Sequence, residues 1–431
     1  MGTLNMDYAC HTPDHTSRRT LLKAVGLSGI SWLTPLSHLL ARESEAKDMA
    51  KSVILLWLDG GPSQLDTFDP HPGTKIGGET RAINTALKGV QLAEGLEQTA
   101  ELMQDISLIR SVTSKEGDHE RAAYNMKTGY RPSPTVVHPS MGAILCHQLT
   151  DSAVEIPRHV SILANNRAGR GGALGTRYDA FRIGDPASRI PDVTPQVNDA
   201  RMQQRLEDLS VIDRQFARGR RPDLEQNLTL HQATIQRAMK MMHSDQLKAF
   251  DVNDTPASER MAYGNTAFGR GCLAAIRLIE TGVRCVEVTL GGFDTHVNNY
   301  EVHMEKKKIL DPAFSALIKD LKARDLLRST IVLCGGEFGR TPKMNPAEGR
   351  DHWPHGFSVA IAGGTFVGGQ VIGATDPEGV KKEPRDKVRV QDIHTTVLHA
   401  LGIDPETEYM TSAGRPVLLS DGRLIKGLMP I

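Results

Sequence analysis

The sequence predicts an α/β protein with a mostly parallel sheet flanked by helices. Three apolar runs support the sheet, and each ends at a glycine turn with an acidic residue beside the glycines: Val53–Leu58 before Asp59, Val286–Leu290 before Asp294, and Ile331–Cys334 before Glu337. A continuous apolar run is typical of a strand that is buried on both faces of a parallel sheet. Segments with helical spacing lie between these runs, which is the alternation that βαβ units require.

The remaining elements follow from the same patterns in chain order. Further strands are expected at Ile106–Val112, Val160–Leu163 and Phe357–Ala362, and a hairpin at Gly363–Gly373. Helices are expected at Leu92–Met103, Arg121–Lys127, Ser140–Leu149, Gly264–Thr281, Phe314–Leu327 and Val390–Leu401. A charged helical insertion is expected at about 197–250, because apolar residues such as Leu206 and Leu209 recur at helical spacing.

The N-terminal 50 residues are expected to be a leader and spacer, followed by one domain over residues 51–431. The segment Ser17–Lys23, with its arginine pair and leucine pair, resembles a twin-arginine export motif. The stretch Ala24–Ala41 is interrupted by Gly26 and Pro35, so no integral membrane span is expected in the mature chain. The segment predicts recognition by the twin-arginine export machinery and a periplasmic or extracellular location. The alternative interpretation is the start of a basic amphipathic helix.

The composition argues against some classes of partner. The 51 basic and 51 acidic residues leave no net charge with histidines neutral, so the chain gives no reason to expect nucleic acid as a partner. The five cysteines show no paired metal-binding spacing, and a disulfide framework is not expected in a chain of this length.

Acidic residues and histidines at the expected strand ends predict a metal site. The predicted ligands are Asp59, Asp294, His296, Glu337, His352 and His355. Carboxylates and imidazoles that converge on one point are suited to one or two divalent ions such as zinc, calcium, magnesium or manganese. Any one of these acids alone is typical of a turn or a helix cap, so the prediction depends on their joint occurrence.

The segment after the Ile106–Val112 strand supplies candidates for catalysis. Thr113 and Ser114 are candidate nucleophiles, and His119 is a candidate ligand, acid, base or nucleophile. Arg340 is expected to grip a developing anion. Lys115, Arg121 and Asp351 are the remaining candidates for substrate contacts. For each arginine, a structural salt bridge is the alternative.

These motifs together resemble a bacterial family, the domain-of-unknown-function family 1501. The matching stretches include LLWLDGGPSQLDTFDP, HERAAYNMKTGYRPSP, GGFDTHVNN, GEFGRTPKMN and GRDHWPHGFSVAIAGG. The family is related to the alkaline phosphatase and sulfatase superfamily, so the resemblance implies an alkaline phosphatase-like, doubly wound sheet. The resemblance implies that Asp59 is the metal aspartate of the first strand and that Asp294 and His296 are the Asp/His pair of one metal. It also implies that Glu337, with His352 or His355, completes the set.

One departure from the sulfatase pattern concerns the nucleophile. Sulfatases have a Cys or Ser four residues before an Arg, and here Gly117 takes that position before Arg121. The formylglycine nucleophile is therefore absent, and Thr113, Ser114, His119 or water must replace it. Two functions follow: an exported metal-dependent hydrolase of phosphate or sulfate esters, acting on a small molecule or a polysaccharide, or a non-catalytic binding protein that keeps the fold. An isomerase or mutase is a third, less supported class.

Overall fold

The computed structural model describes residues 49–150, 153–217, 230–411 and 413–430. The predicted leader and its twin-arginine motif lie outside these residues. Within the described part of the chain, no helix is both long enough and apolar enough to cross a membrane.

Nine strands form the central sheet: β1 (Ser52–Asp59), β4 (Ile106–Thr113), β5 (His159–Ile162), β6 (Phe181–Ile183), β7 (Cys285–Gly291), β8 (Thr330–Gly335), β11 (Phe357–Gly363), β12 (Val371–Ile372) and β13 (Val388–Arg389). Their order is β12-β4-β11-β8-β1-β7-β5-β6, and β13 also pairs with β4. Strand β11 is antiparallel to β4 and β8, and the other pairings of this sheet are parallel. The predicted mostly parallel sheet is therefore confirmed.

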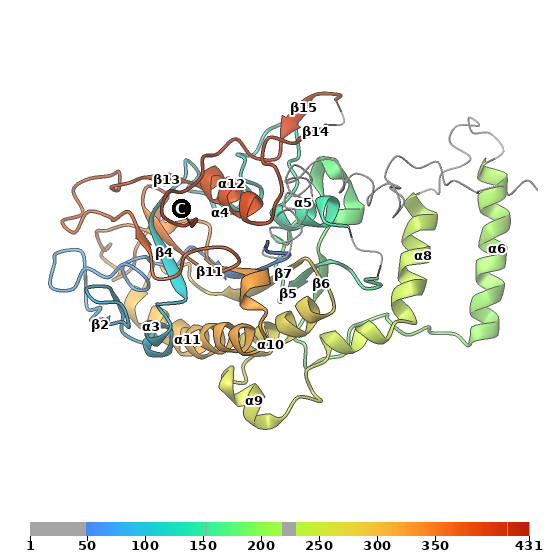
Figure 1. Cartoon of the computed structure of the whole chain (residues 1–431), viewed down its shortest axis with the longest axis horizontal. Coiled ribbons are helices and arrows are strands. Elements are labelled where there is room, and N and C mark those ends of the chain that lie inside the picture. Colours follow the sequence, from blue (N-terminus) through green and yellow to red (C-terminus); the bar gives the residue numbers. More distant parts are fainter. Residues whose placement is uncertain (1–48, 151–152, 218–229, 412, 431) are drawn as a thin grey trace, which may run out of the picture. The chain divides into compact units, whose positions relative to one another are not determined.

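Helices cover both faces of the sheet (Figure 1). On one side, α10 (Ala267–Glu280) and α11 (Asn299–Ala323) pack with Ile54, Leu56 and Leu58 of β1. On the other side, α5 (Met141–Gln148) and α12 (Val390–Ala400) join a second apolar cluster that includes Val53. This division follows from the strand geometry, because alternate side chains of a strand face opposite sides of its sheet. Helix α4 (His119–Thr128) lies beside α12.

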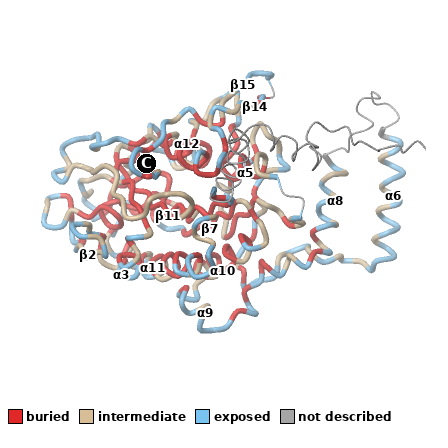
Figure 2. The backbone as a smooth tube through the Cα atoms, in the orientation of Figure 1, coloured by how far each residue is buried: buried red, intermediate tan, exposed pale blue. Residues whose placement is uncertain are grey.

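The smaller elements lie outside the central sheet. They are the hairpins β2 (Ala82–Asn84) with β3 (Gln91–Ala93), β9 (Gly339–Arg340) with β10 (His352–Trp353), and β14 (Glu408–Met410) with β15 (Pro416–Leu418); helices α3 (Glu97–Glu101), α6 (Asp199–Ala217), α8 (Leu230–Met242) and α9 (Ala257–Ala262); and 3-10 turns at Gly172–Leu174, Thr176–Tyr178, Asp245–Phe250 and Leu327–Ser329. Helices α6 and α8 occupy the range predicted as an insertion, and most of the described α6 residues are exposed (Figure 2).

Three predicted elements differ from the structure. The helix expected at Leu92–Met103 is reduced to α3, because its first residues form β3 and Gly95 then adopts a φ of 86°. The hairpin expected at Gly363–Gly373 is absent, since β12 pairs in parallel with β4 instead. The helix expected at Phe314–Leu327 begins earlier, at Asn299, and accommodates Pro312. The other predicted strands and helices are confirmed within a few residues.

Candidate metal centre

The carboxyl ends of β1, β4, β7 and β8 meet at one edge of the sheet, because these strands run in the same direction. Asp294 and Glu337 come shortly after β7 and β8, and His119 begins α4 after β4. His352 reaches the same edge through the β9–β10 ladder, which places it opposite Arg340. The strand ends therefore bring together side chains that are far apart in the sequence.

Gly60 makes this close approach possible. Its φ of 110° is rare for residues with a side chain, and an added Cβ would lie 2.5 Å from the backbone nitrogen of Asp294. The Gly60 N–H also donates to Glu337 Oε1 at 3.0 Å. The turn after β1 thus packs directly against the two segments that carry Asp294 and Glu337.

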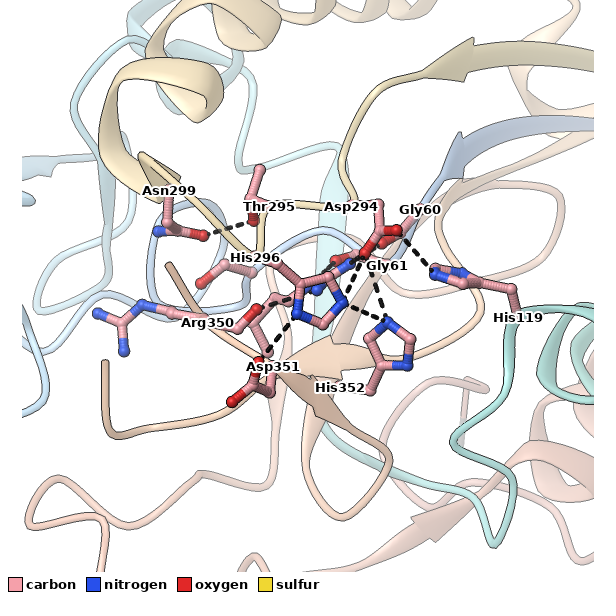
Figure 3. A network of polar contacts seen from close by, with 12 residues as sticks. Gly60, Gly61, His119, Asp294, Thr295, His296, Asn299, Arg350, Asp351 and His352 are labelled. Atoms are coloured by element: carbon pink, nitrogen blue, oxygen red, sulfur yellow. Dashed lines mark hydrogen bonds and ion pairs between the residues drawn. The ribbon is translucent and has the colours of Figure 1, made fainter. Parts of the chain in front are cut away.

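The Asp294 carboxylate lies at the centre of a cluster of imidazoles (Figure 3). Its Oδ2 is 3.3 Å from His119 Nε2, and its Oδ1 is 3.2 Å from His296 Nε2 and 3.4 Å from His352 Nε2. We call His119, Asp294, His296 and His352 the histidine cluster. Partial burial would raise the pKa of Asp294, but Arg340 and the nearby imidazoles lower it to about 2, so the carboxylate is ionised at neutral pH.

Each imidazole of the histidine cluster is held through its Nδ1 atom by an oxygen acceptor: His296 by Asp351 Oδ1 at 2.9 Å, His352 by the Gly117 carbonyl at 2.8 Å, and His119 by Glu337 Oε1 at 2.6 Å. Carbonyl and carboxylate oxygens only accept hydrogen bonds, so each Nδ1 is the protonated, donating atom. In the neutral ring, Nε2 then presents a lone pair. Acceptors of this kind orient the rings of metal-bound histidines.

The spacing of these atoms suits a metal ion. His296 Nε2 and His352 Nε2 lie 3.0 Å apart, and two lone pairs at this distance repel unless a proton or a cation lies between them. Ligand atoms about 2.0–2.1 Å from a tetrahedral ion lie roughly 3.3 Å from one another. One ligand atom from each of His119, Asp294 and His352 also lies within 4.8 Å of the other two. The residues present therefore fit a divalent metal.

Glu337 supports the cluster from a fully buried position. Its Oε2 is buried without a hydrogen-bond partner among the described residues, and the same is true of His119 Nε2. An unsatisfied buried polar atom costs roughly 1–3 kcal/mol, so a bound cation would offset part of this cost. The hydrogen bond from His119 to Glu337 raises the pKa of His119 despite its partial burial. A proton and a metal therefore compete for this imidazole.

Arg340 orients Asp294. Its side chain is fully buried, its Nε donates to the Gly61 carbonyl, its Nη1 to the Arg350 carbonyl, and its Nη2 to the Gly60 carbonyl and to Asp294 Oδ1. The predicted role of Arg340 in gripping a substrate anion does not suit this geometry, because the guanidinium is enclosed and its donors are engaged. It fixes the β1 turn and the Asp294 carboxylate in one arrangement.

Asp59 lies at the same edge of the sheet but belongs to a separate group. Arg167 Nη1 lies 2.9 and 3.1 Å from its two oxygens, and the Trp57 indole donates to Oδ1 at 3.0 Å. Arg167 Nε also donates to Glu120 on α4. Asp59 therefore pairs with a cationic side chain, and the structure does not place it in the histidine cluster.

Other predicted residues lie outside the histidine cluster. His355 packs against Trp353, with ring centroids 5.0 Å apart, on the far side of Pro354. The Thr113 hydroxyl donates to the Val388 carbonyl at 3.3 Å, and the Ser114 hydroxyl to Asn125 Oδ1 at 3.1 Å. Lys115 is exposed, and Arg121 forms an ion pair with Glu116. Of the predicted substrate contacts, only Asp351 touches the cluster, as the acceptor for His296.

Of the cavities that helix α4 lines among the described residues, two are large enough for a ligand. One has a volume of about 220 Å³ and is lined by Glu120, Tyr124 and Lys127 of α4 together with Arg167 and Arg170. The other has a volume of about 470 Å³ and is lined by Asn125 of α4, by Ser114 and Lys115, and by residues of the 382–391 segment. Both volumes are of the order of a small-molecule site.

Sequence reasoning missed two features that hold this edge together. In the sequence, Arg167 is only one residue of a loop rich in glycine and arginine, and no pattern predicts its contact with Asp59. Glu287 of β7 accepts from Lys127 Nζ at 2.8 Å, from Ser161 Oγ at 3.2 Å and from Gly169 N–H at 3.2 Å. It therefore connects β7, α4 and the Arg167 loop inside the core. One polar residue in an apolar strand was the only available signal.

A family model described as a protein of unknown function, DUF1501, matches residues 50–429. The chain belongs to this family. The match confirms the resemblance inferred from the sequence motifs. No curated protein sequence matches this DUF1501 chain significantly.

The chain is also similar to solved structures at low identity. They include the PsFucS1 sulfatase from Pseudoalteromonas sp. (12% identity, 84% of this chain and 70% of that chain, TM-score 0.40) and a protein of the alkaline phosphatase superfamily from Vibrio parahaemolyticus (13%, 82% and 67%, 0.38). A third is the alkaline phosphatase of the Antarctic bacterium TAB5 (13%, 83% and 99%, 0.36), of which two mutants have Mg bound. Scores this low do not assign an activity to this chain.

Proposed function

We propose that this DUF1501 protein is an exported, metal-dependent hydrolase of phosphate or sulfate esters. The observation that carries the proposal is the histidine cluster, in which three imidazole Nε2 atoms surround one carboxylate while each Nδ1 is held by an acceptor. Such a set is costly to assemble without a cation, because lone pairs and negative charge face one another.

The donor set indicates the class of metal. His119, Asp294, His296 and His352 would hold the ion, which would act as a Lewis acid on an ester oxygen. Three imidazoles and one carboxylate favour zinc among the four predicted ions. Asp294 and His296 are about half exposed, so a substrate can approach the cluster from solvent.

Water is the proposed nucleophile. Thr113 and Ser114 donate their hydroxyl protons to partners outside the histidine cluster, and glycine occupies position 117. Arg167, which is paired with Asp59 and Glu120, lines the cavity that could receive the part of the ester outside the cluster. The chain's own groups thus supply metal ligands and an adjoining cavity.

A non-catalytic binding protein is the second candidate. The observation that favours it is the same lack of a side-chain nucleophile, since a metal centre can also hold an anionic ligand without turning it over. The two functions share the histidine cluster and differ in whether bound ester is hydrolysed.

Metal content and turnover separate these possibilities. Purified protein is supplemented in turn with zinc, magnesium, calcium or manganese, and bound metal is measured by elemental analysis and calorimetry. The proposal expects stoichiometric metal in the wild type and in Glu305→Gln, a surface control on α11, and its loss in Asp294→Asn. Aryl phosphate and sulfate esters should then be hydrolysed by the metal-bound wild type and by Glu305→Gln, but not by Asp294→Asn. Metal without turnover supports the binding protein, and no metal under any supplement refutes the hydrolase.

Export is tested separately. The support for it is the arginine pair at positions 18 and 19 within Ser17–Lys23. Replacing both arginines by lysine should retain the precursor in the cytoplasm of the producing bacterium. Equal amounts of wild type and variant in the periplasmic fraction would contradict twin-arginine export.

A further inference from the structure

The larger cavity beside α4 is a concentration of positive charge. We call it the basic cavity. Its volume is about 470 Å³, and its charged lining consists of Lys115, Arg131, Lys382, Lys387, Arg389 and Glu383. The whole chain has equal numbers of basic and acidic residues, so five cations against one acid in a single cavity is a local departure from that balance.

Part of this charge is not neutralised by neighbouring acids. Arg131, Lys387 and Arg389 have ion-pair partners in Glu116, Glu383 and Asp392, respectively. Lys115 and Lys382 form no ion pair with any described residue. Burial lowers the pKa of His355 in the same wall, and Lys382 and Lys387 lower it further, as expected in a positive field.

The basic cavity is close to the histidine cluster. Two hydrogen bonds connect the segment around Ser114 with the segment that carries His352. The Ser114 N–H donates to the Pro354 carbonyl at 2.8 Å, and His352 Nδ1 donates to the Gly117 carbonyl at 2.8 Å. His355 lines the cavity and His352 belongs to the cluster. Three residues of chain span at most about 11 Å, so the backbone positions of His352 and His355 lie within the length of an oligosaccharide.

The remaining lining of the basic cavity is polar. Thr113, Ser114, Asn125 and Gln391 supply hydroxyl and amide groups. Apart from His355, no aromatic side chain lines it among the described residues. A cavity with several cations and hydrogen-bonding groups is suited to an anionic group on a polar, hydroxylated carrier.

We propose that the basic cavity binds a second sulfate or phosphate group of the ester substrate, so that the substrate is a multiply charged oligosaccharide ester. The inference rests on the proposed hydrolysis at the histidine cluster, because it assigns the cleaved group to the cluster and the second anion to the cavity. A free inorganic anion has the same chemistry and is the other possible occupant.

The test compares ligands that differ by one charged group. A disaccharide with two sulfate groups and the same disaccharide with one are titrated calorimetrically into the full chain at low salt. The variant Lys115→Ala/Lys382→Ala removes the two unpaired lysines. Its matched control, Lys88→Ala/Lys319→Ala, removes two exposed lysines elsewhere, and thermal unfolding checks that both variants are folded. Inorganic phosphate is added as a competitor, and metal content is measured on the same samples.

The proposal expects the disulfated ligand to bind the wild type and the control about tenfold more tightly than the monosulfated one. In Lys115→Ala/Lys382→Ala this ratio should fall to near one. A ratio near one in the wild type, or a ratio that the variant does not change, overturns the proposal. So does phosphate binding that depends on the two lysines without any gain from the second sulfate. Because metal content is measured separately from the ratio of affinities, absence of metal would instead be a failure of the proposed hydrolase.

Discussion

The buried pair Lys127–Glu287 allows a sharp test of how the core positions the candidate site. Lys127 Nζ lies 2.8 Å from Glu287 Oε2, and the two side chains are only 6% and 3% exposed. Burial would raise the pKa of Glu287, but Lys127 and His159 hold it well below its usual range. The carboxylate is therefore ionised inside the sheet, and its partner is an equally buried ammonium group.

The perturbation is Glu287→Gln, which keeps the shape and removes the charge. At 2.8 Å and an effective dielectric constant near 20, the lost attraction is roughly 6 kcal/mol. Part of this is offset because the ion pair is itself costly to desolvate. Removal of one partner of a buried pair typically costs about 3–5 kcal/mol, since the other charge is left uncompensated. We expect a loss of this size in the free energy of unfolding.

The double variant Lys127→Met/Glu287→Gln should recover a large part of the loss, because no unpaired charge remains in the core. The exposed pair Lys322–Asp105, with side chains 62% and 22% exposed, provides the control. Lys322→Met should change stability by less than about 1 kcal/mol. Urea unfolding of all four proteins measures these differences, provided that the denaturant dependence stays constant.

Hydrogen exchange adds a second readout. Glu287 accepts the Gly169 N–H, and an added Cβ at Gly169 would lie 2.5 Å from Glu287 Oε1. A change at Glu287 should therefore raise the exchange rate of the loop that carries Arg167. The reasoning is refuted if Glu287→Gln unfolds at the wild-type urea concentration, or if the double variant is no more stable than Glu287→Gln.

Three further predictions test separate parts of the structure. Asp351→Ala removes the acceptor that holds His296 Nδ1, so calorimetry should show metal affinity reduced by about 10- to 100-fold, and an unchanged affinity would contradict the role of Asp351 in orienting this ring. Burial lowers the pKa of His394 to about 4 from 6.5; the unfolded chain therefore binds this proton first, and about 3 kcal/mol of stability should be lost as pH falls from 6.5 to 4. Measured by urea unfolding, the stability of His394→Gln should fall by about 3 kcal/mol less than that of the wild type over this pH range. An equal fall in both proteins would refute the prediction. Gly60→Ala should lower both stability and metal affinity, because its Cβ would meet the Asp294 backbone at 2.5 Å, and a thermal midpoint equal to that of the wild type would contradict this clash.

The parts of the fold that the sequence predicts well are those set by local patterns. Strand β1 is apolar along its length because both faces are covered, and its alternate residues belong to the two core clusters. The same pattern identified β7 and β8. The short strand β12 was missed, because its pairing with β4 depends on a contact more than 250 residues away in sequence. Two apolar residues between glycines carry no signal for such a partner.

The candidate site likewise has features that the sequence predicts and features that it does not. Asp294, His296 and His352 were predicted because each follows or precedes a recognisable strand or turn. Their mutual geometry was not predictable, since the β9–β10 ladder and the Gly117 carbonyl decide where His352 points. For Asp59, the sequence predicted the position at a strand end but not the partner. The partner is Arg167, which lies in a loop more than 100 residues later.

Gly117 has a structural role that its sequence position alone does not indicate. An added Cβ at Gly117 would make only an ordinary contact, 3.8 Å from Pro354 Cγ, so packing does not require glycine there. What the segment contributes is its backbone, because the Gly117 carbonyl accepts from His352 Nδ1 and sets the tautomer of that ring. The residue that the sequence motif matches to the sulfatase nucleophile position thus orients a candidate ligand in this chain. Under the proposed hydrolysis, the chemistry at this edge would depend on the metal-binding groups and on water, and the metal-content measurement is the experiment that tests it.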